Sequence, residues 1–204
     1  INFFDNIDGG ASGALAIAAI CLFTLSFQGS QFLIAALSIV LAGATLGFLL
    51  WNKPPARIYM GDAGALFLGV LLATLTVRFE PNSQTQIGSY LTPLLLLAIP
   101  ILDTSVAVIS RVRRKVSPFQ GGKDHLSHRL VRYGLSRKVS AITLWLLSAF
   151  YGLFAVLIST QNFNYEFLIL ITASVIWISL LTLFLILIFP TKRLHFDVCF
   201  AIDS

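Results

Sequence analysis

Six long apolar segments, separated by short polar stretches, dominate this 204-residue sequence. Because about 20 apolar residues span the hydrocarbon core of a membrane as a helix, each segment predicts one crossing. The segments cover residues 10–28, 31–51, 63–79, 88–110, 140–160 and 166–189. Only 11% of the residues are charged, against about 25% in an average soluble domain. We therefore expect an all-α fold, a polytopic bundle of about six transmembrane helices that forms one integral membrane domain over residues 1–204.

The breaks between and within the segments indicate how the helices are connected and where one of them bends. Residues 28–31 leave only a tight turn between the first two helices, which must run antiparallel. Pro93 and Pro100 fall inside the fourth segment, where proline removes a backbone hydrogen bond and favours a kink. A carboxylate-rich motif occupies the very first residues, so we expect this chain to be the C-terminal portion of a longer protein.

Alternating crossings sort the polar stretches onto two sides of the membrane. The first side holds residues 1–9, 52–62, 111–139 and 190–204, and the second holds 29–30, 80–87 and 161–165. Of the 14 Lys and Arg residues, 13 lie on the first side and only Arg78 lies toward the second. The positive-inside rule therefore predicts that the first side is cytoplasmic. Topology and anionic lipid head groups explain the net charge of +5, and we expect no nucleic-acid partner.

The N-terminal polar stretch has a three-residue period. Asn2, Asp5 and Asp8 would share one face of a helical turn. Carboxylates also favour the start of a helix, so a capping role and a binding role both remain open. The glycines that follow, Gly9, Gly10 and Gly13, allow close approach of a neighbouring helix or a bound phosphate, and we favour helix packing.

Asp62 precedes the third apolar segment. Its carboxylate either caps that helix or serves as an oxygen ligand for Mg²⁺, which proteins usually hold with one or two carboxylates and substrate phosphates. Tyr59, three residues earlier, offers a ring on which a base stacks, although a single interfacial Tyr is also a common membrane anchor.

The stretch 111–139 carries nine Lys or Arg residues together with His125 and His128. A basic loop beside a membrane is often a topology signal that contacts lipid. The two histidines lack a third ligand at zinc spacing. With Lys123 and Arg129 beside them, an anion clamp for a diphosphate is the better functional interpretation.

Asp103 lies about two turns inside the membrane surface on the fourth segment. A buried and unpaired carboxylate is costly in a membrane, so we expect Asp103 to have a partner or a functional role. The residue itself does not indicate which.

Four ordered stretches together resemble the polyprenyl-phosphate N-acetylhexosamine-1-phosphate transferases. Residues 2–9 resemble the family motif N-x-x-D-N-x-D-G, and residues 55–64 resemble P-A-K-x-F-M-G-D-S-G. Residues 100–104 and 124–130 resemble P-x-x-D-T and D-H-x-H-H-R-L. Ser127 replaces one of the paired histidines, which leaves His125 and His128 in the clamp. Gly10 also stands where the family commonly has Leu, and Ala63 and Ala65 stand where it has Ser. The family's N-terminal helices, with their paired-aspartate loop, are absent from this chain.

The resemblance implies a reaction. A polyprenyl phosphate such as undecaprenyl phosphate would attack a UDP-N-acetylhexosamine, accept N-acetylhexosamine-1-phosphate and release UMP, which initiates cell-envelope glycan synthesis. The cofactor would be Mg²⁺, with Mn²⁺ as an alternative. The active site would lie at the cytoplasmic face of the plasma membrane, in a multi-pass protein embedded in the lipid bilayer, and a homodimer is left open.

The resemblance also implies roles for individual residues. Asn2 and Asp62 would hold the metal, and Asp5 and Asp8 would be the catalytic carboxylates. The residues implied to bind substrate are Tyr59, Gly61, Lys123, Asp124, His125, His128 and Arg129, with Asp103 as a further candidate.

Two alternatives remain at this stage. A non-enzymatic membrane protein, such as one half of a transporter, would place carboxylates along the bundle interior or make Asp103 part of an ion path. A truncated and inactive family member would bind lipid or nucleotide without turnover.

Overall fold

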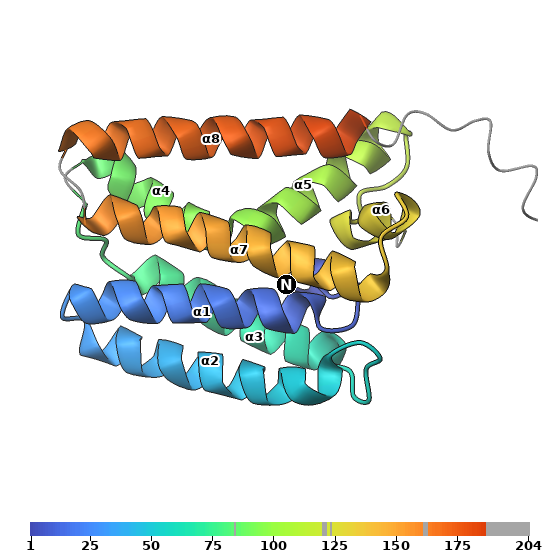
Figure 1. The fold of residues 1–204 in the computed structure, drawn as a ribbon, viewed down its shortest axis with the longest axis horizontal. Helices are drawn as coiled ribbons and strands as arrows, with labels where there is room; N and C mark the ends of the chain where they lie inside the picture. Colours follow the sequence, from blue (N-terminus) through green and yellow to red (C-terminus); the bar gives the residue numbers. More distant parts are fainter. Residues whose placement is uncertain (84, 120–121, 123, 161–162, 187–204) are drawn as a thin grey trace, which may run out of the picture.

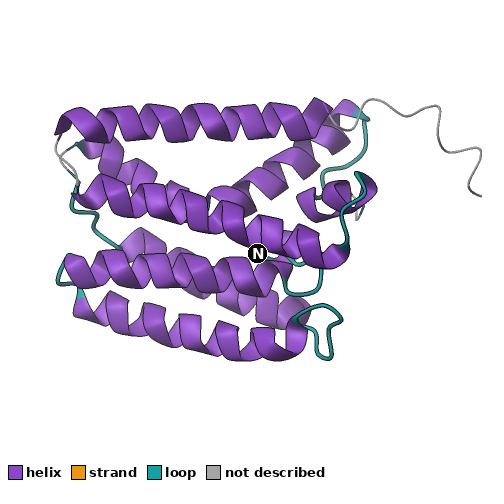
Figure 2. Cartoon of the chain, in the orientation of Figure 1, coloured by secondary structure: helices purple, strands orange, loops and turns teal. Residues whose placement is uncertain are grey.

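The structure, a computed structural model, describes residues 1–83, 85–119, 122, 124–160 and 163–186. These residues form helices and loops and no strand (Figure 2). The elements are η1 Asn2–Phe4, α1 Gly10–Gln28, α2 Phe32–Asn52, α3 Gly61–Arg78, α4 Gln86–Leu96, α5 Ala98–Arg113, α6 Leu126–Arg132, α7 Arg137–Thr160 and α8 Phe163–Ile186.

Five of these helices (α1, α2, α3, α7 and α8) are long and apolar enough to cross a membrane. The helices α4 and α5 meet the same test only as a pair, which is bent by 74°. Counting that pair as one span gives six crossings. The prediction of an all-α, multi-pass membrane bundle is therefore confirmed.

The predicted kink in the fourth segment is a complete break at Leu97. Pro100 lies in the first turn of α5, where the backbone amides have no partner within the helix and a missing N–H costs nothing. Pro93 lies inside α4, close to its C-terminal end. The two prolines thus mark the helix on either side of the break.

The helix α6 was not predicted, since residues 111–139 were expected to form a loop. Its seven residues are too few to produce a clear hydrophobic period. The flanking helix α7 begins at Arg137, three residues earlier than the apolar run suggested.

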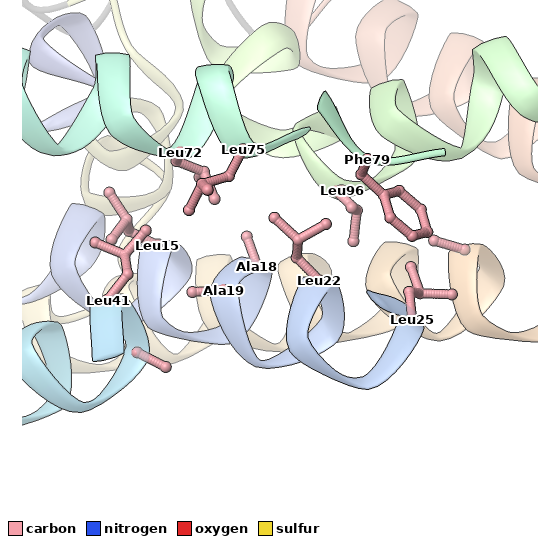
Figure 3. Packing of buried hydrophobic residues seen from close by; sticks show 12 residues of the cluster. Leu15, Ala18, Ala19, Leu22, Leu25, Leu41, Leu72, Leu75, Phe79 and Leu96 are labelled. Atoms are coloured by element: carbon pink, nitrogen blue, oxygen red, sulfur yellow. The ribbon is translucent and has the colours of Figure 1, made fainter. Parts of the chain in front are cut away.

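The helix α1 is the centre of the bundle. Of its membrane-length window 67% is buried, against 22–39% in the other four single spans. Small and leucine side chains of α1 pack against α2, α3 and α4, with Leu22 fully buried in the middle (Figure 3). This packing follows from the Ala-rich sequence of α1, which lets neighbouring helices approach closely.

A second apolar cluster fixes the elements that carry the polar motifs. Phe4 of η1 and Leu126 of α6 are both buried, and they insert among side chains of α1, α5, α7 and α8. Each therefore anchors a polar segment to the bundle, helped by Ile1 and Ile7 in the first segment and by Leu130 in the second.

The polar stretches gather at two ends of the bundle (Figure 1). The motif end, on the right of the figure, contains residues 1–9, 53–60 and 114–136. The opposite end contains residues 29–31 and 79–85. This is the grouping that alternating crossings predicted, except that residues 190–204 lie outside the described residues. It brings three of the four sequence motifs to one end, and the fourth, residues 100–104 at the start of α5, is joined to them through Asp103.

Candidate functional site

The N-terminal motif is not a regular helical turn. Asn2 and Phe4 belong to η1, which ends at Asp5, and Asp8 lies in a turn before Gly9. Gly9 adopts a left-handed conformation with φ of 71°, which turns the chain into α1. The expected single helical face through Asn2 and Asp8 is therefore wrong, because the 3-10 helix ends after Phe4.

Asn52, the last residue of α2, connects this motif to the next one. Its Oδ1 accepts hydrogen bonds from the Gly9 amide at 3.0 Å and the Ser12 hydroxyl at 2.8 Å. Its side-chain amide donates to the Ile58 carbonyl at 3.0 Å. Sequence reasoning missed Asn52, although a buried amide before two prolines at a helix end was a usable signal.

Asp8 makes a second connection between the same segments. Its Oδ2 accepts a hydrogen bond from the Ala56 amide at 3.1 Å. Asp5 lies nearby and is half-buried. Burial is the main cause of a raised pKa of the Asp5 carboxyl, the Asp8 carboxylate acts in the same direction, and the α-amino group of Ile1 opposes both.

The glycines after this motif serve helix packing. A Cβ on Gly13 would lie 2.1 Å from Nε1 of Trp145 on α7, so no larger residue fits without movement. The Trp145 indole N–H donates to the Gly9 carbonyl at 2.9 Å. Close approach of α7 to the start of α1 therefore explains Gly13, in agreement with the packing interpretation.

The second motif projects outward from the motif end. Gly61 has φ of 66° and starts α3, and Asp62 occupies the first turn with an exposed side chain. The N-cap residue is Met60, and no side-chain hydrogen bond caps α3, so of the two alternatives for Asp62 the capping role is not seen. Tyr59 is 75% exposed and its ring is accessible for stacking.

Asp103 has the partner that its position required. Its side chain is only 1% exposed. Oδ2 lies 2.7 Å from Nδ1 of His125, and Oδ1 accepts a hydrogen bond from the Leu126 amide at 2.6 Å. The segment before α6 therefore folds back onto α5 and covers this carboxylate.

Arg111 is the centre of the contacts around the fourth motif, and sequence reasoning gave it no role. Its Nη2 lies 3.2 Å from Nε2 of His125, and its Nη1 donates to the Pro118 carbonyl at 2.7 Å. Its Nε is 3.2 Å from Oδ2 of Asp124, whose Oδ1 pairs with Arg114 at 2.5 Å. Arg111 is 2% exposed, so this arginine holds the loop from inside.

Arg129 also points inward. Its Nε donates to the Asp124 carbonyl at 2.6 Å and its Nη1 donates to the Phe184 carbonyl at 2.5 Å. Burial is the main cause that lowers the pKa of Arg129 to about 10. His128 is half-buried on the same helix, and the predicted clamp residue Lys123 lies outside the described residues.

Two apolar cavities lie beside the break between α4 and α5. One, of about 350 Å³, lies between these helices and α8 and is lined by Leu94 and Trp177. The other, of about 320 Å³, lies between α3, α5 and the start of the chain, with Gly69, Pro100 and Thr104 in its wall. Thr104 is the neighbour of Asp103, so the second cavity reaches the level of the motif network.

Residues 1–80 match the family model described as glycosyl transferase family 4. The chain is 33% identical to the probable undecaprenyl-phosphate N-acetylglucosaminyl 1-phosphate transferase of Bacillus subtilis, over 93% of the chain and 49% of that protein. It is 39% identical to the decaprenyl-phosphate N-acetylglucosaminephosphotransferase of Mycolicibacterium smegmatis, over 71% of the chain and 41% of that protein.

These matches confirm the family resemblance. A more distant relative is the phospho-N-acetylmuramoyl-pentapeptide-transferase of Streptococcus equi, 30% identical over 74% of the chain and 44% of that protein. The chain spans about half the length of these curated relatives or less. It is thus a homologue of part of a polyprenyl-phosphate sugar-1-phosphate transferase.

The metal site of the resemblance stays a prediction. Among the described residues, no three His, Cys, Asp or Glu side chains come together as a metal cluster. Mg²⁺ needs fewer protein ligands, because substrate phosphates and waters complete its shell. Asn2 and Asp62 offer the oxygen donors that such an ion prefers, and Asp62 is exposed.

Proposed function

We propose that the protein containing this chain transfers N-acetylhexosamine-1-phosphate from a UDP-sugar to a polyprenyl phosphate at the cytoplasmic face of the membrane. The main support is the gathering of three motifs at one end of a bundle of membrane helices, with the motif on α5 joined to them through the bonds of Asp103 to His125 and Leu126. The names of the relatives give the reaction class and two of the lipid acceptors. N-acetylglucosamine is the sugar that those two names share.

The chemistry is a displacement at phosphorus. An oxygen of the lipid phosphate attacks the β-phosphorus of the UDP-sugar, the bond from that phosphorus to the bridging oxygen breaks, and UMP leaves. Phosphoryl transfer depends mainly on positioning and charge neutralisation. At the motif end, the exposed carboxylate of Asp62 and the basic side chains would contribute to both.

Each part of the nucleotide sugar has a candidate partner. The exposed Tyr59 ring would stack on the uracil base, and the left-handed turn at Gly61 would leave backbone space for the phosphates. His128, Lys123 and the basic loop would bind the diphosphate. A bound Mg²⁺ would supply charge neutralisation at the phosphates, held by Asp62 and Asn2.

Asp5 is the better placed of the two N-terminal carboxylates to accept a proton. Its raised pKa, caused by burial and by the nearby Asp8, makes it a stronger base than an ordinary carboxylate. Asp8 is engaged with the Ala56 amide and would hold the loop. The lipid chain would enter along the cavity between α3 and α5.

The transporter alternative has less support. Asp103 is bound to His125 and Leu126 at the motif end. The other fully buried carboxylate among the described residues, Glu166, accepts from Ser83 at the opposite end. The two carboxylates therefore do not line one path.

The test uses the full-length protein in detergent with Mg²⁺, polyprenyl phosphate and UDP-N-acetylglucosamine, and measures UMP release. Asp62→Asn should lower the rate by about 10²-fold or more, because the lost charge acts at the transferring phosphate. Glu80→Gln removes an exposed carboxylate at the far end of α3 and should leave the rate unchanged. Wild-type protein that releases no UMP with any UDP-N-acetylhexosamine would contradict the proposal.

A further inference from the structure

Asp103, His125 and Arg111 form a continuous hydrogen-bonded row inside the motif end. Their side chains are 1%, 3% and 2% exposed. The row runs from Oδ2 of Asp103 to Nδ1 of His125 at 2.7 Å, and from Nε2 of His125 to Nη2 of Arg111 at 3.2 Å. Both nitrogens of the imidazole are therefore engaged, and neither faces solvent.

The two neighbours of His125 dictate where its proton lies. A guanidinium has only donors, so Nε2 of His125 must accept the hydrogen bond from Arg111. Asp103 accepts at the other nitrogen, so the proton is on Nδ1. His125 is therefore neutral and held in a single tautomer.

The row fixes three segments against one another. Asp103 lies on α5, and its second oxygen holds the Leu126 amide, the first of α6. Arg111 reaches across the loop to the Pro118 carbonyl and to the Asp124 carboxylate. One buried arginine of α5 thus holds two points of the connection to α6, at Pro118 and at Asp124.

The charges in this network alternate. Asp103 and Asp124 are acidic, Arg111 and Arg114 are basic, and the neutral His125 separates Asp103 from Arg111. Compensation of this kind is what permits a fully buried arginine, since removing one partner would leave an uncompensated buried charge. We therefore expect the loss of the Asp103 carboxylate to disturb the contacts of His125 and Arg111.

We infer that Asp103 is a positioning residue that acts through neutral His125 on Arg111, and so sets the position of Pro118 and Asp124 between α5 and α6. His125 supports these residues from inside the bundle and does not itself bind the diphosphate. The kinetic consequence rests on the proposed function, whereas the tautomer of His125 does not. The two can therefore be tested separately.

The first test measures the tautomer by ¹⁵N NMR on full-length protein labelled at histidine, with His125 assigned by its loss in His125→Gln. We expect an Nδ1 that carries a proton and an Nε2 that does not, at neutral pH. A doubly protonated ring, or a proton on Nε2, would overturn the inference whatever the enzyme does.

The second test uses Asp103→Asn. The asparagine oxygen can still accept from the Leu126 amide, but its NH₂ group then faces Nδ1 of His125. The imidazole proton must move to Nε2, where it opposes the donors of Arg111. We expect the ¹⁵N signals to report this change, and kcat and kcat/KM for UMP release to fall together by about 10²-fold, the usual cost of misplaced groups.

Glu166→Gln is the matched control. It also removes a buried carboxylate, bound there by Ser83 and Thr85, but at the opposite end of the bundle. We expect it to leave both the His125 tautomer and kcat per folded molecule unchanged. Asp103→Asn with wild-type kcat and a wild-type tautomer would overturn the inference.

A pair of His125 variants separates positioning from direct chemistry. The oxygen of Gln can accept from Arg111 without a titratable ring, so His125→Gln should keep activity within about tenfold of wild type, while His125→Ala should lose about 10²-fold. Equal loss in both, relative to folded protein, would overturn the positioning role.

Discussion

Asn52 joins the first two motifs through single hydrogen bonds, one to Gly9, which lies 43 residues earlier in the sequence, and one to Ile58. An asparagine at the end of an apolar helix, before Pro54 and Pro55, is also what an ordinary helix terminator looks like. The sequence therefore predicted the end of α2 but not its partners. Which backbone groups an amide reaches depends on how α1 and α2 pack.

Asn52→Ala should destabilise the protein. The Gly9 amide and the Ser12 hydroxyl would lose their acceptor in a buried place, which costs about 1–3 kcal/mol in the free energy of unfolding. Denaturation in mixed micelles, followed by tryptophan fluorescence, measures this change. Asn82→Ala, at an exposed position of the opposite end, is the control. Identical unfolding of the two variants would show that Asn52 does not hold the motifs together.

At the scale of elements, α6 shows the limit of hydrophobic periodicity. Its position depends on Leu126 and Leu130, which pack on the core, and on the contacts of Arg129, and two leucines in seven residues are too few to predict a helix. Arg129 was expected to bind the diphosphate, and its guanidinium instead reaches the last turn of α8 at Phe184. This hydrogen bond therefore ties α6 to the backbone of α8.

Arg129→Met should loosen α6 while it preserves the length of the side chain. A hydrogen bond from a charged donor contributes about 1.5–3 kcal/mol, so we expect amide exchange in α6 and the last turn of α8 to become about tenfold faster or more. Hydrogen–deuterium exchange with mass spectrometry measures this. Arg137→Met, at an exposed position of α7, should show wild-type exchange. Unchanged exchange in Arg129→Met would mean that the apolar contacts of Leu126 and Leu130 hold α6 without Arg129.

The sequence predicted the break between α4 and α5 only in part. Pro93 and Pro100 predicted a kink, because proline acts locally on its own helix. The angle of 74° was not predictable, since it depends on how α8 and α3 pack on the two halves. The prolines predicted where the break lies, and tertiary packing determines its angle.

At the scale of the whole molecule, the six segments and the grouping of the polar stretches followed from hydropathy. The length of an apolar run and the alternation of crossings are properties of the sequence itself. Contacts such as Asp103 with His125, 22 residues apart, depend on a loop that folds back. The sequence predicted a partner or a functional role for Asp103 and did not indicate which, so His125 was not identified as the partner.

The orientation predicted by the basic residues can be measured by cysteine labelling. In a protein with Cys21 and Cys199 replaced by Ser, Ser117→Cys marks the motif end and Asn82→Cys marks the opposite end. A membrane-impermeant maleimide added to intact cells should label Asn82→Cys, and in inside-out vesicles it should label Ser117→Cys. The reverse pattern would put the motif end on the wrong side for a cytoplasmic nucleotide sugar.

We propose that the motif end transfers a sugar phosphate and not a sugar. Mass spectrometry of both products, made by the full-length protein from UDP-N-acetylglucosamine and polyprenyl phosphate, tests this directly. We expect UMP together with a lipid diphosphate that carries one N-acetylhexosamine. Release of UDP with a lipid monophosphate sugar, or no lipid product at all, would contradict it.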